Sequence, residues 1–246
     1  MKKTSSKGKI ALAVVVALIL SLVIGAWIYV SDYYKADDEK IEAFMPKKTT
    51  EVYNKDYIAF GDSNSENGFV FYPGGKVESD AYIPLMRILA ESGVFCILFD
   101  MPFNLAVLNI DAADGVCEAY PDIKNWYIGG HSLGGSMAAS YMSDNIEEFS
   151  GLVLLASYST ADISDSGVRV LSVYGSEDGV MNSEKYEENK ENLPSDFTES
   201  LIEGGCHAYF GMYGEQDGDG RASISAEEQI MFTADKILAF LNEENG

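Results

Sequence analysis

A serine between glycines in the segment NWYIGGHSLGGSMAAS has the spacing of a nucleophile elbow. Gly130, Ser132 and Gly134 form the pattern G-x-S-x-G, between a run that predicts a strand and a stretch that predicts a helix. A serine on such a strained turn needs room on both sides, which glycines leave because they have no side chain. The pattern predicts Ser132 as a nucleophile and the backbone N–H of Leu133 as an oxyanion donor, although a glycine-rich turn without chemistry has the same letters.

A serine nucleophile needs a general base, and the chain contains only two histidines, His131 and His207. His131 adjoins the serine in the elbow, so its side chain is expected to diverge from the hydroxyl. His207 follows a run that predicts a strand ending at residue 202, and a loop there can reach the carboxyl edge of a parallel sheet. His207 is therefore the predicted base.

The imidazole in turn needs a carboxylate that fixes its tautomer. Asp178 in YGSED follows a predicted strand at the same sheet edge, and Glu177 beside it is the alternative. We prefer Asp178 because the shorter carboxylate suits a tight turn. A second oxyanion donor is expected from the loop after an earlier strand, where PGG supplies Gly75, with Gly74 or Lys76 within one register.

These motifs resemble those of the α/β-hydrolase superfamily, and more narrowly its compact bacterial members related to dienelactone hydrolases and small esterases. The matching segments are FYPGGKV, FDMPFN, GGHSLGG, YGSED and GGCHAYFGMYG. The resemblance implies that Ser132, Asp178 and His207 form a catalytic triad. Dienelactone hydrolases proper have a cysteine where Ser132 stands, so their substrate is not carried over.

The pocket that would receive the acyl group is less well marked in the sequence. Met101, Phe103 and Tyr209 are candidate lining residues, although core packing explains such side chains equally well. Only residues 156–169 separate the predicted strand 152–155 from the predicted strand that precedes Asp178, which leaves little room for a lid. An open site for small or exposed acyl substrates is expected.

Continuous apolar runs such as GLVLL and VFCILF predict strands that are buried on both faces, and they alternate with helical stretches. This order predicts an α/β fold with a doubly wound, mostly parallel sheet, in one domain over residues 51–246 with minimal or no cap. The expected strands are residues 57–60, 69–72, 94–99, 126–128, 152–155, 170–174 and 198–202. The expected helices are residues 81–92, 111–120, 134–142, 183–192 and 225–241.

Residues 10–30 carry no charge, and a helix of this length is about 30 Å long, enough to cross a bilayer core. We favour an uncleaved transmembrane anchor over a cleaved signal, whose apolar region is shorter. Lysines in residues 1–9 predict that this basic segment lies in the cytoplasm and the body outside, in a single-pass protein of the cell membrane. Residues 31–50 are expected to be a tether or a short amphipathic helix.

The net charge of the chain is −22, and lysines at positions 2, 3, 7 and 9 give residues 1–30 a charge of +4. The remainder therefore carries −26, which repels phosphate backbones and makes nucleic acid a poor partner. Three cysteines cannot all pair; a Cys117–Cys206 disulfide is conceivable, and Cys96 is expected in the core. No cofactor is expected.

Two further motifs compete with the elbow and its partners. Ser63 in GDSNSENG resembles a Gly-Asp-Ser block, but Gly204 stands where that family places an aspartate before its histidine, so Ser63 is expected to be a turn residue. Residues 217–228 resemble a calcium loop, but Arg221 and Ala222 replace a ligand and the turn glycine. A cap of the last helix by Ser223 or Ser225 is favoured, and no metal site is expected.

The sequence thus predicts a membrane-anchored extracytoplasmic serine hydrolase that cleaves carboxylic esters, with a small-molecule or lipid-like substrate. Two alternatives stay open. One is a non-catalytic binding protein on the same fold. The other is an acyltransferase or peptidase with the same triad.

Overall fold

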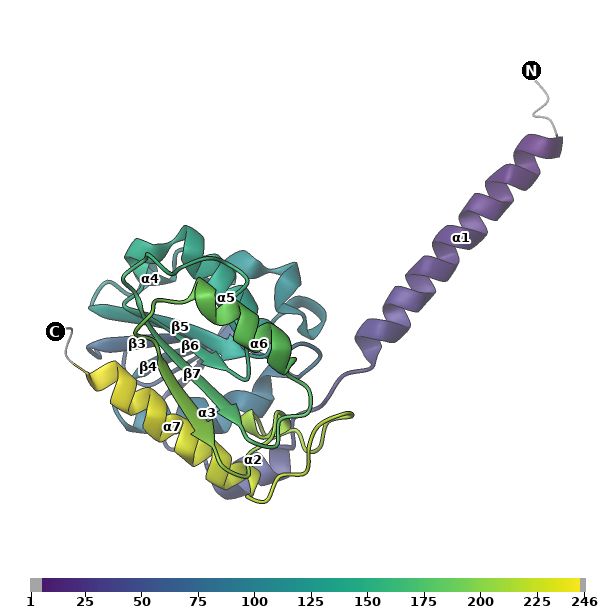
Figure 1. Ribbon diagram of the computed structural model, residues 1–246. Coiled ribbons are helices and arrows are strands. Elements are labelled where there is room, and N and C mark those ends of the chain that lie inside the picture. The colour runs from purple at the N-terminus through teal and green to yellow at the C-terminus, as the bar shows by residue number, and fades with distance from the viewer. Residues whose placement is uncertain (1–5, 244–246) are drawn as a thin grey trace. The chain divides into compact units, whose positions relative to one another are not determined.

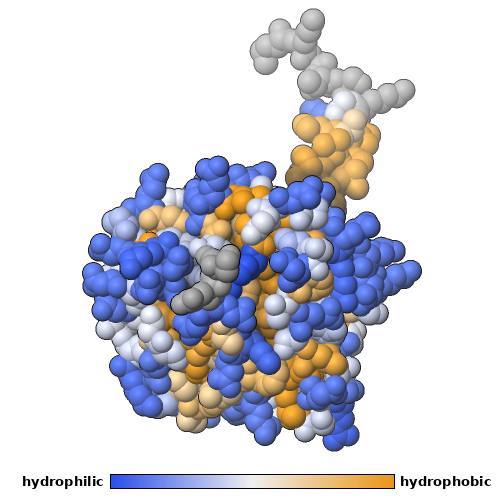
Figure 2. All heavy atoms as spheres, turned by 60° about the vertical axis from the view of Figure 1, so that its left-hand side comes forward, coloured by the Kyte–Doolittle hydropathy of each residue, from blue (hydrophilic) through white to orange (hydrophobic). Residues whose placement is uncertain are grey.

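The computed structural model describes residues 6–243, which form two compact units that divide between Tyr33 and Tyr34. The first unit is the helix α1 (Ser6–Ser31). From Gly8 onward α1 is long and apolar enough to cross a membrane, a property that secretory signal sequences share. Its surface is almost continuously hydrophobic in Figure 2, whereas polar and apolar side chains are interspersed on the visible face of the second unit.

The second unit is built on an eight-stranded sheet with the strand order β1-β2-β4-β3-β5-β6-β7-β8. The first two strands are antiparallel to their neighbours, and all others run parallel. The fold is therefore α/β with a mostly parallel sheet, as the sequence predicts. The strands are β1 (Glu51–Tyr53), β2 (Tyr57–Phe60), β3 (Asn67–Tyr72), β4 (Phe95–Phe99), β5 (Asn125–His131), β6 (Gly151–Leu155), β7 (Arg169–Gly175) and β8 (Thr198–Ile202).

Helices cover both faces of this sheet (Figure 1). The short α2 (Asp38–Phe44), α3 (Ile83–Glu91) and α7 (Ala226–Asn242) pack on one face. The helices α4 (Val116–Ala119), α5 (Leu133–Asp144) and α6 (Ser183–Asn189) lie on the other. Successive residues of β3 alternate between the two layers, since Phe69 and Phe71 join the first core and Val70 and Tyr72 the second.

The structure differs from the expected elements in two places. The edge strand β1 is not among the expected strands, and the expected helix 111–120 is reduced to α4 after a series of 3₁₀ turns. The Tyr72 hydroxyl explains why the helix is shorter than expected, because it donates to the carbonyl of Ile110 and accepts from the amide of Ala113. Within residues 31–50, where a tether or a short amphipathic helix is expected, the structure has the short helix α2, whose Ile41 is buried against the domain.

Candidate active site

Ser132 occupies a sharp turn between β5, which ends at His131, and α5, which begins at Leu133. Its backbone has φ 52° and ψ −122°, a conformation that L-residues with side chains rarely adopt. The flanking glycines make the turn possible: a Cβ on Gly130 would lie 2.6 Å from the carbonyl oxygen of Tyr72, and one on Gly134 would overlap the carbonyl of Pro73. This is the geometry of a nucleophile elbow.

The strained turn is clamped through both of its backbone polar groups. The N–H of Ser132 donates to the carbonyl of Leu155 at 2.9 Å. Its carbonyl accepts from the hydroxyl of Ser157 at 2.7 Å and from the amide of Ser136 at 3.2 Å. The conformation at Ser132 is thus held from the neighbouring strand β6, the loop after it and the first turn of α5.

His207 and Asp178 are brought together although 28 residues lie between them in the chain. His207 Nδ1 lies 2.8 Å from Asp178 Oδ2, and both side chains are almost fully buried. The second oxygen of Asp178 accepts from the amides of Val180 and Met181 at 2.9 and 2.8 Å. The carboxylate is thus fixed in place and holds the imidazole through Nδ1. The other ring nitrogen, Nε2, points away from Asp178.

Asp219 joins the loops that carry this pair, and the sequence analysis did not identify that role. Its Oδ1 accepts from the amides of Gly179, His207 and Gly220 at 3.0, 3.2 and 2.8 Å, and its Oδ2 accepts from Ala208 at 2.8 Å. Burial opposes the charge on this carboxylate, but the four amides outweigh it and lower the pKa of Asp219. The motif DGDG is the available signal, but a cation loop and a helix-capping loop are the two interpretations that its letters suggest.

His131 lies beneath His207, with the two ring centroids 4.6 Å apart, and does not take part in the Asp178 contact. Its Nδ1 is 2.8 Å from the hydroxyl of Tyr82, which also accepts from the amide of Gly74 at 3.1 Å. Because the Tyr82 oxygen accepts from Gly74, its own hydroxyl proton is available to Nδ1 of His131. Burial, and next the charge of His207, lower the pKa of His131, so that it stays neutral.

The loop after β3 offers three candidate oxyanion donors, and hydrogen bonding distinguishes them. The amide of Gly74 donates to Tyr82, and that of Lys76 donates to the carbonyl of Asn104 at 2.7 Å. Within the described residues, the amide of Gly75 has no such acceptor. A Cβ on Gly75 would lie 2.9 Å from the Leu133 side chain, so the two expected donors, Gly75 and Leu133, belong to adjoining loops.

Ser132 opens into a shallow cleft of about 250 Å³. Its walls come from the elbow, the loop after β6 and the loop after Asp178, and comprise Ser132, Leu133, Ser136, Ala156, Ser157, Tyr158, Val180, Met181 and Asn182. The cleft therefore contains the serine together with the loop that fixes Asp178. In the part of the chain that the structure describes, no hydrogen bond joins the hydroxyl of Ser132 to His207; unliganded sites often tighten only around substrate.

The three residues expected to line the acyl pocket lie elsewhere. Met101 is buried in the core between the sheet and α5, and Phe103 is exposed on the surface. Tyr209 lines a different cleft with Glu215 and Arg221. None of the three is in the lining of the Ser132 cleft: the loop after β4 turns Met101 into the core and Phe103 into solvent, and Tyr209, which comes after His207 in the chain, lines the other cleft.

The other candidate sites have ordinary structural roles. Ser63 is in an exposed turn, and Ser225 forms a capping box with Glu228 at the start of α7. All three cysteines are free, so the Cys117–Cys206 disulfide is absent. Among the residues that the structure describes, no cluster of His, Cys, Asp and Glu could hold a metal ion.

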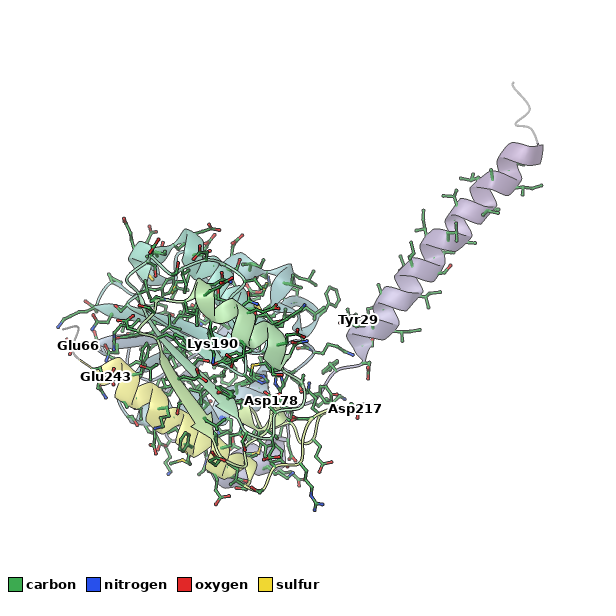
Figure 3. The ribbon with its side chains drawn as sticks, viewed as in Figure 1. Tyr29, Glu66, Asp178, Lys190, Asp217 and Glu243 are labelled. Carbon is green, nitrogen blue, oxygen red and sulfur yellow. The ribbon has the colours of Figure 1, made fainter. Side chains whose placement is uncertain are left out.

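Figure 3 places Asp178 and Asp217 at one end of the sheet and Glu66 and Glu243 at the other.

Solved structures with this fold include hydrolases of several kinds. A protein named TT1662 from Thermus thermophilus aligns with a TM-score of 0.59 and 12% identity over 80% of this chain and 100% of its own. A dienelactone hydrolase from Anabaena variabilis aligns with a TM-score of 0.55 and 12% identity, over 79% of this chain and 98% of its own. Est1E from Butyrivibrio proteoclasticus aligns with a TM-score of 0.54 and 14% identity, over 80% of this chain and 100% of its own. At these identities the likeness establishes the fold alone.

At the level of sequence, no curated protein matches the chain. The model of one family, described as the alpha/beta hydrolase family, matches residues 68–231. That region begins in β3, includes the loop after β3, the elbow and both loops of the Asp178–His207 pair, and ends in α7. The chain belongs to the alpha/beta hydrolase family.

Proposed function

We propose that this protein is a serine hydrolase that cleaves carboxylic esters through Ser132, His207 and Asp178. The observation that carries the proposal is the Asp178–His207 pair, at 2.8 Å, in a domain whose Ser132 occupies a strained elbow. Buried carboxylate–imidazole pairs and exposed elbow serines recur together in serine hydrolases because the reaction needs a nucleophile, a base and a group that orients the base.

In the proposed reaction, His207 Nε2 takes the proton of the Ser132 hydroxyl as the oxygen attacks the ester carbonyl. Asp178 holds the Nδ1–H of His207 and stabilises the imidazolium that forms. The amides of Leu133 and Gly75 donate to the oxyanion. The imidazolium then gives its proton to the departing alkoxide, which leaves an acyl-enzyme on Ser132. A water molecule, deprotonated by His207, releases the acid and restores the serine.

The site of action is also part of the proposal. Helix α1 is long and apolar enough to act as a membrane anchor, and the basic residues before it favour a cytoplasmic N-terminus. The acidic body would then lie outside the cell. This arrangement predicts that the full-length protein stays in the membrane fraction after a high-salt wash and that protease added to intact cells digests the domain.

The proposed chemistry is tested by labelling with a fluorophosphonate probe. We expect the native protein to be labelled and to hydrolyse short p-nitrophenyl esters, and Ser132→Ala to lose both properties. Asp178→Asn should retain the fold and lose about 10³- to 10⁴-fold in kcat, because the imidazole is no longer held in the required tautomer, whereas Glu177→Gln is the matched control. A native protein that is not labelled, or a Ser132→Ala variant labelled equally, would refute the assignment.

A further inference from the structure

The chain enters the second unit beside the loop of Gly75 and Lys76, which adjoins Leu133 at the rim of the Ser132 cleft. Tyr34 is the first residue of this unit, and its amide donates to the carbonyl of Lys76 at 2.8 Å while its carbonyl accepts from Glu78 at 2.9 Å. Lys76 directly follows Gly75, which adjoins Leu133 of the cleft wall. The segment that leads from α1 is therefore fastened to the loop that carries the expected oxyanion donor.

Very little chain separates this point from α1. The helix ends at Ser31, so only Asp32 and Tyr33 precede Tyr34. Even when fully extended, this connection spans no more than about 11 Å between the Cα atoms of Ser31 and Tyr34. A domain of about 210 residues has a radius of gyration of about 17 Å, so the tether is short compared with the domain. If α1 spans the bilayer, the rim of the cleft is held near the bilayer surface.

An exposed apolar loop lies beside the same rim. Phe103, Val107 and Leu108 expose 57%, 48% and 55% of their surface. They belong to MPFNLAVLNI, residues 101–110, which contains no charged side chain although the domain is strongly acidic. Phe103 and Asn104 both have left-handed backbones, with φ of 55° and 56°, which is uncommon for residues other than glycine.

Two contacts fix this loop next to the cleft. The carbonyl of Asn104 accepts from the amide of Lys76, the residue whose carbonyl accepts from Tyr34. The 3₁₀ turn Ala106–Leu108 packs against α5, whose first residue, Leu133, is in the cleft wall. The tether, the apolar loop and the entrance to the nucleophile thus share one edge of the domain.

We propose that residues 101–110 insert their exposed apolar side chains into the membrane that holds α1, and that Ser132 acts on long-chain acyl esters in that leaflet. This inference rests on the proposed serine hydrolase function. A bilayer with zwitterionic headgroups is the occupant that fits, because the uncharged loop offers apolar contacts while the acidic domain would repel anionic lipid. Three exposed apolar side chains give only weak insertion, but α1 already keeps the protein at the surface.

Insertion of the loop is tested with full-length protein in phosphatidylcholine vesicles whose acyl chains carry bromine. Phe103→Trp in a Trp27→Phe background reports the loop, and Leu201→Trp on the edge strand β8 is the control in the same background. The buried Trp126 is common to both proteins and contributes equally to their emission. We expect the bromine to quench the indole introduced at position 103 and to leave the one at position 201 unchanged. Equal emission of the position-103 reporter in brominated and ordinary vesicles would overturn the proposal.

The substrate class is tested with two esters and one pair of matched variants. The loop variant combines Phe103→Asn with Leu108→Gln and so removes apolar surface from the loop. The control variant combines Leu201→Gln in β8 with Met231→Gln in α7 and removes exposed apolar surface away from the loop. We expect the loop variant to hydrolyse a long-chain ester embedded in the vesicle about tenfold more slowly and p-nitrophenyl butyrate in solution at the unchanged rate. The control variant should match the native protein with both esters.

The outcomes separate the two proposals. If soluble ester is cleaved but the loop variant and the control behave alike with embedded ester, the membrane inference is wrong and the hydrolase assignment stands. If the loop variant lost the same fraction of its hydrolysis rate on both esters, this would also overturn the inference, because it would indicate a general structural effect. If neither ester is cleaved and Ser132 is not labelled, the hydrolase assignment itself fails.

Discussion

Replacement of Asp219 by asparagine tests whether one carboxylate holds together the loops that carry Asp178 and His207. The change preserves size and removes the charge and one of two accepting oxygens. Oδ1 accepts three amides and Oδ2 accepts one, so the NH₂ group faces at least one backbone N–H whichever way the amide turns. Two donors then oppose each other in a partly buried site, which costs more than the loss of a hydrogen bond alone.

The magnitude follows from that count. One lost charge-assisted bond and one unpaired N–H cost about 2 kcal/mol of unfolding free energy, the low end of the range because Asp219 is partly exposed. In a domain of this size the loss corresponds to a fall in Tm of about 4–8 °C. A shift of His207 by about 1 Å would also lower kcat by about 10²-fold, with a smaller change in KM.

The pH dependence gives a second readout. The folded state lowers the pKa of Asp219, so its contribution to stability is present above the pKa of the unfolded chain and is lost as the pH falls through the lower, folded value. The difference in unfolding free energy between the native protein and Asp219→Asn should therefore be full at pH 7 and shrink as the pH falls below about 4.

Thermal unfolding from pH 7 to pH 3 and ester hydrolysis at pH 7 measure these effects. Asp217→Asn is the matched control, because Asp217 is exposed, its amide donates to the hydroxyl of Tyr34, and its carboxylate has no hydrogen-bond partner among the described residues. We expect this control to behave as the native protein does. Native Tm and native kcat in Asp219→Asn would show that the two loops hold their positions without the carboxylate, and would refute the reasoning.

Three further replacements probe the packing around the site, a buried ion pair near the edge of the sheet and an exposed ion pair. Tyr82→Phe unpairs the buried amide and imidazole that its hydroxyl connects, and should cost about 2–3 kcal/mol in denaturant unfolding; a loss below 0.5 kcal/mol, roughly that of a neutral surface change, would argue against the connection. Arg87→Met removes the guanidinium 2.7 Å from Glu51, whose carboxylate keeps Lys47 at 3.1 Å, and should cost about 2 kcal/mol. Lys124→Met breaks an exposed ion pair and should cost less than about 0.5 kcal/mol in the same measurement.

The predictable parts of this protein are those that local sequence determines. The strands of the sheet centre are continuous apolar runs because they are buried on both faces, and the sequence places them to within a few residues. The elbow at Ser132 is recognisable because its conformation requires glycines at fixed positions. The capping box of Ser225 and Glu228 is likewise written within four consecutive residues.

The parts that escaped prediction depend on partners distant in the chain. The strand β1 is three residues long, partly exposed, and exists because it pairs with β2. The sequence favours Gly75 as the second donor but leaves Gly74 and Lys76 open, because the acceptors of those two amides, Tyr82 and Asn104, are not visible in a turn motif. Asp219 binds an amide 40 residues away, so the letters DGDG could not distinguish a cation ligand from an anchor for two loops.

The strain at Ser132 shows how these local and distant contributions combine. A left-handed backbone of this kind costs about 1–3 kcal/mol and persists only where the surroundings determine it fully. Here the glycines permit the close approach of the loop after β3, and the amide of Ser132 is held by Leu155 and its carbonyl by Ser157. The local pattern therefore makes the conformation accessible, and the bonds to β6 and its loop make it the stable one. A serine held this way keeps its hydroxyl at the cleft without relying on a bond to His207.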